Sequence, residues 1–341
     1  MVTGATGFVA AQLIRELLNQ GYRVRGSVRS TLKDLDWLRG LQGAAKLALF
    51  EAELLTEGSF DSACDGATCV MHTASPYALT VKDPQKDLVE PAVQGTLNVL
   101  RAASKSKTVK RVVLTSSVAA MTDEPDIRTR LNEDSWNRKS SLKRNPYYYS
   151  KTMAERAAWD FMKEEKPRFS LVVINPFLVI GPSLGPAVNT SNQIFIDLLT
   201  GKYPAILDLA WGMVDVRDVA LAHVLAMVTP KAKGRYLCAA STLHMREVVK
   251  LLRDSGRAEG FRLPSRSFAN PLGTLMMRGL SFFQPRGVGS YLRTHLGRTP
   301  SFDNGKIKRE LGLTFRPLDK TILDTVADLE KWGHLARTPA P

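Results

Sequence analysis

The chain has 341 residues, of which 44% are hydrophobic and 23% charged, a balance that excludes a disordered or fibrous protein and predicts a soluble globular one. Its formal net charge of +14 could attract anionic partners such as nucleotides, acyl-coenzyme A, nucleic acid or membrane surfaces. Because the Lys and Arg residues are spread along the whole chain, a solvated basic surface is the simpler interpretation, and we expect no nucleic-acid partner.

The cysteines and the apolar runs of the sequence indicate the cellular compartment of the protein. Cys64, Cys69 and Cys238 are odd in number and scattered, so they predict neither a disulfide framework nor a metal site, and they favour a reducing compartment. No run approaches the roughly 20 apolar residues that cross a bilayer, and the N-terminus lacks a signal pattern. We therefore expect a cytoplasmic protein with no membrane span.

The first half of the chain alternates short apolar runs with amphipathic stretches. Residues 1–21 begin as a very short strand, turn through glycines and continue at helical spacing. Further strands are predicted at 22–28, 46–52, 69–75 and 109–117, and a helix at 89–106. Strands that alternate with helices are typical of a parallel sheet covered on both faces. The sequence therefore predicts an α/β fold with a doubly wound, Rossmann-type sheet.

The second half is less regular. Beyond Pro176, stretches rich in Pro and Gly separate a short helix within 191–202, an apolar segment at 212–228 and a helix at 318–333. We expect residues 1–175 to form the Rossmann domain and residues 176–341 a smaller C-terminal lobe. The segment around 212–228 is expected to return to the first domain.

A turn of small residues follows the first strand. Gly4, Gly7 and Ala10 recur at intervals of three between a strand and a helix. Small residues there let the backbone approach a pyrophosphate, and a helix N-terminus offers N–H groups to an anion. A tight turn without a ligand is the alternative, but the strand–turn–helix context favours a dinucleotide site.

Arg29 stands at the end of the next strand, 29 − 7 = 22 positions after Gly7. A carboxylate at this place would accept hydrogen bonds from the ribose of NAD, whereas an arginine matches the 2′-phosphate of NADP. Lys33 could add a second positive charge. The sequence favours NADP(H), with an Arg29 that is merely solvated as the alternative.

A tyrosine and a lysine share one face of a predicted helix. Asn145 is the expected N-cap and Pro146 the first residue of a helix that continues to Pro167. On it, Tyr147 and Lys151 are four residues apart and face the same way, whereas the next two tyrosines point elsewhere. An ammonium near a phenol lowers the pKa of the phenol. Tyr147 is therefore the candidate acid or base.

Hydroxyl residues end the strand predicted at 109–117. A hydroxyl at the carboxyl end of a parallel strand faces the crevice in which ligands bind in open α/β sheets. A pair such as Ser116-Ser117 can also be a simple turn. Because Tyr147 and Lys151 follow about 30 residues later, we expect Ser117 to belong to the same site.

Five motifs together resemble one family. They are TGATGFVA at 3–10, HTASP at 72–76, VVLTSSVAA at 112–120, Tyr147-x-x-x-Lys151 and NPFLVIGP at 175–182. The chain resembles the extended short-chain dehydrogenases/reductases of the NAD-dependent epimerase/dehydratase family. Within it, the dihydroflavonol 4-reductase and cinnamoyl-coenzyme A reductase group is the most similar. The resemblance covers almost the whole chain and implies NADPH-dependent reduction of aldehyde or ketone carbonyls.

The resemblance also implies the roles of individual residues. Ser117, Tyr147 and Lys151 would be catalytic. The implied cofactor-binding residues are Gly4, Thr6, Gly7, Phe8 and Val9 on the pyrophosphate, Arg29 with Lys33 on the 2′-phosphate, Glu53 and Leu54 around the adenine, Thr73, Ala74 and Ser75 along the middle of the cofactor, Tyr147 and Lys151 again, and Pro176 and Val179 near the nicotinamide. The C-terminal lobe would bind the substrate, and no metal is implied.

The chain departs from the group at three places. Glu53-Leu54 replaces the usual Asp-Leu pair against the adenine. Thr122 stands where the dihydroflavonol enzymes carry an Asn, and Pro146 and Tyr148 stand where the cinnamoyl-coenzyme A enzymes carry a Trp and a Cys. Neither plant substrate is therefore predicted.

Other functions of the same fold remain open. A 3β-hydroxysteroid dehydrogenase or a nucleotide-sugar epimerase would use the same Tyr and Lys, although dehydratases generally place acidic residues directly after the strand-end hydroxyl. Here Val118, Ala119 and Ala120 follow it. A non-enzymatic, NADP-binding regulator is a further alternative, but it would not need the Ser, Tyr and Lys together.

Apolar residues of the second half favour a fairly apolar carbonyl substrate. Phe177, Met213 and Phe282 are examples of such residues. For the oligomeric state we expect a monomer or a homodimer. The apolar run at 270–283 could line the substrate pocket, cover it as a lid, or pack as a helix on the C-terminal lobe. His72 and His223 are predicted to be buried structural residues.

Overall fold

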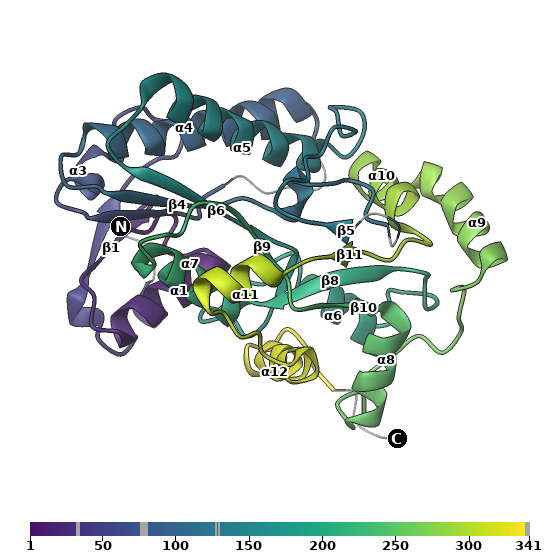
Figure 1. The fold of residues 1–341 in the computed structure, drawn as a ribbon. Helices are drawn as coiled ribbons and strands as arrows, with labels where there is room; N and C mark the ends of the chain where they lie inside the picture. The colour runs from purple at the N-terminus through teal and green to yellow at the C-terminus, as the bar shows by residue number, and fades with distance from the viewer. Residues whose placement is uncertain (32–34, 76–80, 127, 129, 338–341) are drawn as a thin grey trace.

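A computed structural model describes residues 1–31, 35–75, 81–126, 128 and 130–337. Lys33 therefore lies outside the described residues. Figure 1 shows a sheet with helices on both sides and a group of smaller elements at one end. Within the described residues, no helix is long and apolar enough to cross a membrane.

The main sheet is parallel. From one edge to the other, its strands are β2 (Leu47–Glu51), β1 (Val24–Val28), β3 (Cys69–His72), β4 (Arg111–Thr115), β6 (Ser170–Pro176) and β9 (Gly234–Cys238). Val2 forms parallel bridges to Gly26 of β1 and to Met71 of β3, so a single residue takes the place of a central strand. The predicted doubly wound Rossmann-type fold is confirmed.

Helices cover both faces of this sheet. One layer consists of α3 (Asp61–Cys64), α4 (Glu90–Lys105) and α5 (Pro146–Glu165), and the other of α1 (Phe8–Asn19), α7 (Val216–Val228) and α11 (Gly305–Leu311) (Figure 1). Each layer packs its apolar side chains against the strands and so forms a separate hydrophobic core. Residues of α7 pack with residues of α1 in one of these cores, because apolar side chains occur on nearly every face of α7.

The remaining elements follow the sheet or connect its strands. They are α2 (Asp36–Arg39), the turns η1 (Ala44–Lys46), η2 (Gln85–Val89), η3 (Val118–Ala120) and η4 (Ser281–Phe283), the strands β5 (Arg130–Leu131), β7 (Leu178–Ile180), β8 (Ala210–Asp215), β10 (Ser241–His244) and β11 (Ser301–Phe302), and the helices α6 (Gln193–Leu199), α8 (Met245–Asp254), α9 (Pro271–Leu280), α10 (Arg286–His295) and α12 (Leu318–Lys331). The second sheet has the order β10-β8-β7. The division of the chain at residue 176 stays a prediction.

The carboxylate of Glu155 joins α5 to three strands. It is buried and accepts hydrogen bonds from Arg235 Nε of β9 at 2.6 Å, from Ser116 Oγ after β4 at 2.5 Å and from Asn175 Nδ2 of β6 at 2.8 Å. The guanidinium of Arg235 also lies 4.1 Å from the ring centroid of Trp136. A carboxylate held by this many donors is fully compensated despite its burial.

We expect Glu155→Gln to lower the free energy of unfolding by about 3–5 kcal/mol, because it leaves the Arg235 guanidinium buried without a counter-ion. Urea unfolding measures the change. Glu164→Gln, at an exposed position of the same helix, is the matched control and should have little effect. A loss no larger than that of the control would contradict this account of the ion pair.

Three buried histidines make the folded chain sensitive to acid. Burial lowers the pKa of His72 to about 3, of His223 to about 4 and of His295 to about 3. In the unfolded chain each takes up a proton near pH 6.5. The unfolded state thus binds more protons below that pH, and the free energy of unfolding falls as the pH falls, by about 1.4 kcal/mol per pH unit for each histidine.

We expect His223→Gln to reduce this slope by up to about 1.4 kcal/mol per pH unit between pH 6 and 4.5, which is the contribution of one buried histidine. Urea unfolding at several pH values measures the slope. Thr115→Val is the matched control, because it removes the 2.7 Å hydrogen bond between Thr115 Oγ1 and His223 Nε2 but keeps the titrating ring. Equal slopes in the two variants would refute the assignment.

Candidate active site

The turn between Val2 and α1 is packed closely enough to require glycine. Gly4 has a φ of +65°, and a Cβ there would lie 3.1 Å from Ala74 Cβ. A Cβ at Gly7 would lie 3.1 Å from the carbonyl oxygen of Gly4. No side chain caps the start of α1, so its first N–H groups are available to an anion. These features fit the pyrophosphate of a dinucleotide.

Thr3 connects this turn to the end of β3. Its Oγ1 accepts hydrogen bonds from the backbone N–H groups of Thr73 and Ala74, both at 2.9 Å, and lies 2.9 Å from His72 Nδ1. Because two donors already point at this oxygen, the hydroxyl donates its own hydrogen to Nδ1, and neutral His72 carries its proton on Nε2. His72 is therefore structural, as the sequence predicted.

Lys151 lies between Tyr147 and the end of β3. Its Nζ donates a hydrogen bond to Ser75 Oγ at 2.9 Å and lies 5.8 Å from the ring centroid of Tyr147. Burial lowers the pKa of Lys151 to about 8, so the ammonium remains mostly charged at neutral pH. The predicted shared face of Tyr147 and Lys151 is present, whereas the Tyr148 hydroxyl points to His295 Nε2, 3.1 Å away.

The two serines after β4 differ in their surroundings. Ser116 is buried and donates to Glu155, whereas Ser117 is half-buried and begins η3, where its Oγ accepts a hydrogen bond from Ala119 N at 3.1 Å. The carbonyl of Ser117 accepts a hydrogen bond from Asn175 Nδ2 at 3.2 Å. Ser117 thus lies beyond the carboxyl end of β4 with its backbone held in place and its hydroxyl hydrogen available to a ligand.

The start of α5 corrects one prediction. The helix begins at Pro146 as expected, but the side chain of Asn145 does not cap it. Asn145 has a φ of +48°, its Nδ2 donates to Thr294 Oγ1 and its backbone N–H donates to Ser290 Oγ, both at 3.1 Å. Asn145 occupies the predicted N-cap position, but its side chain binds α10 instead of capping the first turn of α5. As a result, α10 fixes the residue from which the helix of Tyr147 starts.

The residues expected around the adenine lie on loops at the ends of β1 and β2. Arg29 and Glu53 are exposed. Leu54 is held from two sides, since its carbonyl accepts from Asn98 Nδ2 at 3.0 Å and its side chain lies over Gly95. A Cβ at Gly95 would come within 2.5 Å of Leu54 Cγ. Asn98 therefore braces the loop.

The other implied residues lie at the start of α1 and in β6 and β7. Thr6 is exposed, Phe8 and Val9 are half-buried in the first turn of α1, Pro176 is buried at the end of β6, and Val179 is half-buried in β7. Among residues suggested for an apolar pocket, Met213 instead lies in the core of the C-terminal elements, and Phe282 is 72% exposed.

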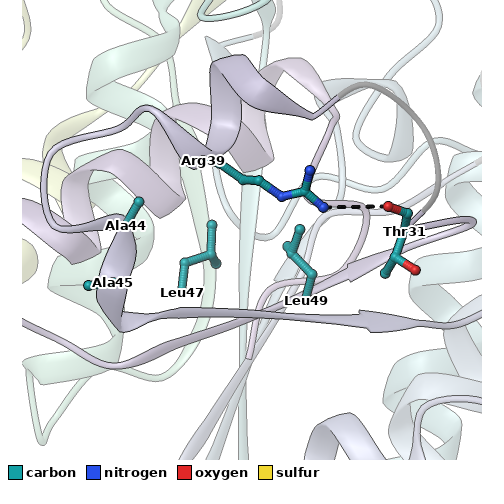
Figure 2. A pocket seen from close by; sticks show the side chains of 6 residues that line it. All are labelled: Thr31, Arg39, Ala44, Ala45, Leu47 and Leu49. Atoms are coloured by element: carbon teal, nitrogen blue, oxygen red, sulfur yellow. Dashed lines mark hydrogen bonds between the residues drawn. The ribbon is translucent and has the colours of Figure 1, made fainter.

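Among the residues that the structure describes, a groove beside β2 is lined by none of the implied site residues. Figure 2 shows it between α2, η1 and β2, lined by Leu47, Leu49 and Arg39, whose Nη2 lies 3.5 Å from the carbonyl oxygen of Thr31. Thr31 is itself fixed, because its N–H and hydroxyl both donate to Glu51 Oε1 at 2.7 Å. This contact lowers the pKa of Glu51 and fixes Thr31, two residues after Arg29.

The described residues offer no metal site, since no three of their His, Cys, Asp or Glu side chains form a suitable group. Two supporting residues that sequence reasoning missed are Thr3 and Ser27. Ser27 Oγ accepts a hydrogen bond from Gly4 N of the glycine turn, and Thr3 Oγ1 accepts one from Thr73 N after β3. A small hydroxyl residue directly before the glycine motif was the available signal for Thr3.

Comparison with known proteins identifies the family. A family model described as the NAD dependent epimerase/dehydratase family matches residues 1–239. Cinnamoyl-CoA reductase 1 of Petunia hybrida is 41% identical over 98% of this chain and 92% of its own length. Tetraketide alpha-pyrone reductase 1 of Arabidopsis thaliana is 36% identical over 98% of this chain and 96% of its own length.

A solved structure agrees with these matches. The yeast methylglyoxal/isovaleraldehyde reductase in complex with NADPH superposes with a TM-score of 0.80, at 30% identity, over 98% of this chain and 99% of that one. The family confirms the expected class of nicotinamide cofactor, and NADPH is the cofactor in the yeast structure. The chain belongs to the NAD dependent epimerase/dehydratase family and is an oxidoreductase similar to its cinnamoyl-CoA reductase relatives.

Proposed function

We propose that this chain is an NADPH-dependent reductase that converts an aldehyde or ketone into an alcohol. The observation that carries the proposal is the cluster of Tyr147, Lys151 and Ser75 beside the glycine turn. It brings a phenol and an ammonium to the edge of the sheet at which a dinucleotide would bind. The names of the relatives support the direction of reduction.

Each catalytic side chain has one task in this proposal. Bound NADPH supplies the hydride to the carbonyl carbon. Tyr147 donates its phenolic proton to the carbonyl oxygen, and Ser117 donates a hydrogen bond to the same oxygen. The ammonium of Lys151 stabilises the tyrosinate that remains. Lys151 is positioned for this role by its hydrogen bond to Ser75.

The alternatives of the same fold have less support. Val118 and Ala119 are buried in η3 directly after Ser117, where a dehydratase would need an acidic side chain. The relatives named above are reductases rather than epimerases. We also infer a cytoplasmic setting, because Cys64, Cys69 and Cys238 are free and buried, which suits a reducing compartment.

We expect Tyr147→Phe to lower kcat by about 100-fold or more, because it removes the proton donor, and to leave the Kd for NADPH nearly unchanged. NADPH oxidation with a panel of aldehydes and ketones measures turnover, and fluorescence titration measures cofactor binding. Tyr149→Phe, two residues along the same helix, is the matched control and should keep its rate. A Tyr147→Phe enzyme with full turnover would refute the assignment.

We expect Arg29→Gln to raise the KM for NADPH by about 10-fold to 100-fold, the value of a charge-assisted hydrogen bond to a phosphate. Turnover with NADH should stay the same, since NADH has no 2′-phosphate. Arg23→Gln, an exposed arginine just before the same strand, is the control. Equal losses with the two cofactors would show that Arg29 does not select between them.

A further inference from the structure

Helix α9 and the turn η4 present their apolar side chains to solvent. Leu272 is 78% exposed, Leu275 68% and Phe283 87%. Met276 and Leu280 are also exposed. The spacing 272, 275, 276, 280 and 283 is that of one helical face, so these side chains form a single stripe. We call this stripe, together with the exposed Phe282, the α9 face.

The α9 helix contacts the protein through Met277, which packs against the core of the C-terminal elements, and through small and polar residues. Thr274 is buried and donates to Asp208 Oδ2 at 3.3 Å, and Arg278 Nη2 donates to the carbonyl of Leu296 at 2.6 Å. A Cβ at Gly273 would come within 2.4 Å of the carbonyl oxygen of Phe268. The helix expected as one alternative for 270–283 therefore packs on the C-terminal elements, but most of its large apolar side chains face solvent.

The segment around this helix is strongly basic. Residues 260–302 contain six arginines and neither Asp nor Glu, although Arg298 is paired with Asp126 and Glu124 of another segment. Arg262 and Arg266 are exposed shortly before α9, and the guanidinium of Arg293 lies 4.6 Å from the ring centroid of Phe282. Apolar and cationic groups therefore occur on the same end of the molecule, opposite the end that carries β1 (Figure 1).

We propose that the α9 face binds the surface of an anionic lipid bilayer. Its leucines and phenylalanines would enter the boundary between head groups and acyl chains, and the neighbouring arginines would contact the anionic head groups. The proposal goes beyond the reductase function and does not depend on it.

Charge decides between a membrane and a second copy of this chain. In a twofold dimer through the α9 face, the same arginine-rich segment of each copy would face the other, and like charges repel. An anionic lipid surface instead attracts the arginines and accepts the apolar side chains. An anionic lipid surface is therefore the partner that matches both the apolar side chains and the arginines.

The test is flotation of the full chain with lipid vesicles. The wild-type chain should float with vesicles of phosphatidylcholine mixed with phosphatidylserine, and much less with phosphatidylcholine alone. Leu275→Ser/Phe283→Ser should weaken binding by about tenfold or more, because both side chains lose their apolar contact with the bilayer. Leu142→Ser/Val228→Ser removes two exposed apolar side chains elsewhere and should bind like the wild type.

A second variant keeps the test valid if the first does not fold. Arg262→Gln/Arg266→Gln leaves the α9 face intact and should weaken binding only to the anionic vesicles, as should raised salt. Three results would overturn the proposal: no flotation of the wild-type chain with phosphatidylserine, equal binding to both lipid mixtures, or light scattering that shows a dimer which Leu275→Ser/Phe283→Ser converts into a monomer.

Discussion

The position of the candidate active site depends on one buried ion pair, Glu155 with Arg235. Glu155 is one turn beyond Lys151 on α5, and its carboxylate is bound by groups from β4, β6 and β9. Moving the helix along the sheet would separate a buried charge from its partners, which is strongly unfavourable. The ion pair therefore sets the height of Tyr147 and Lys151 above the strand ends. Asn175 extends this constraint to Ser117, since the same amide donates to both.

The other half of the site is built around Thr3. The Thr3 hydroxyl, directly after Val2, binds the backbone at the end of β3. It also fixes the tautomer of His72. Ser75 follows on the same loop and accepts the hydrogen bond from Lys151. The glycine turn and the lysine are thus connected through a short series of hydrogen bonds. Rigid support of this kind is what a site for hydride transfer requires, because small displacements of reacting groups greatly lower the rate.

Local patterns predicted much of this structure. The alternation of strands and helices gave the fold, and the four-residue spacing of Tyr147 and Lys151 placed them on one face, because both follow from backbone periodicity. Long-range partners were beyond such reasoning. Asn145 is the N-cap as expected, but its side chain does not cap the helix, because it binds Thr294, about 150 residues later in the chain. Likewise, the apolar run at 270–283 was visible in the sequence, but nothing in it said whether its side chains point inward or outward.

The distance along the chain between these partners has a consequence for synthesis on the ribosome. When residue 165 completes α5, the counter-ion of Glu155 is still 80 residues away from it in sequence, and the groups that hold Asn145 come later still. The nascent N-terminal half thus contains a carboxylate whose burial is not yet compensated. The contacts that hold α5 and Tyr147 are therefore completed only once residues 290–294 have emerged, although most of the sheet is made before them.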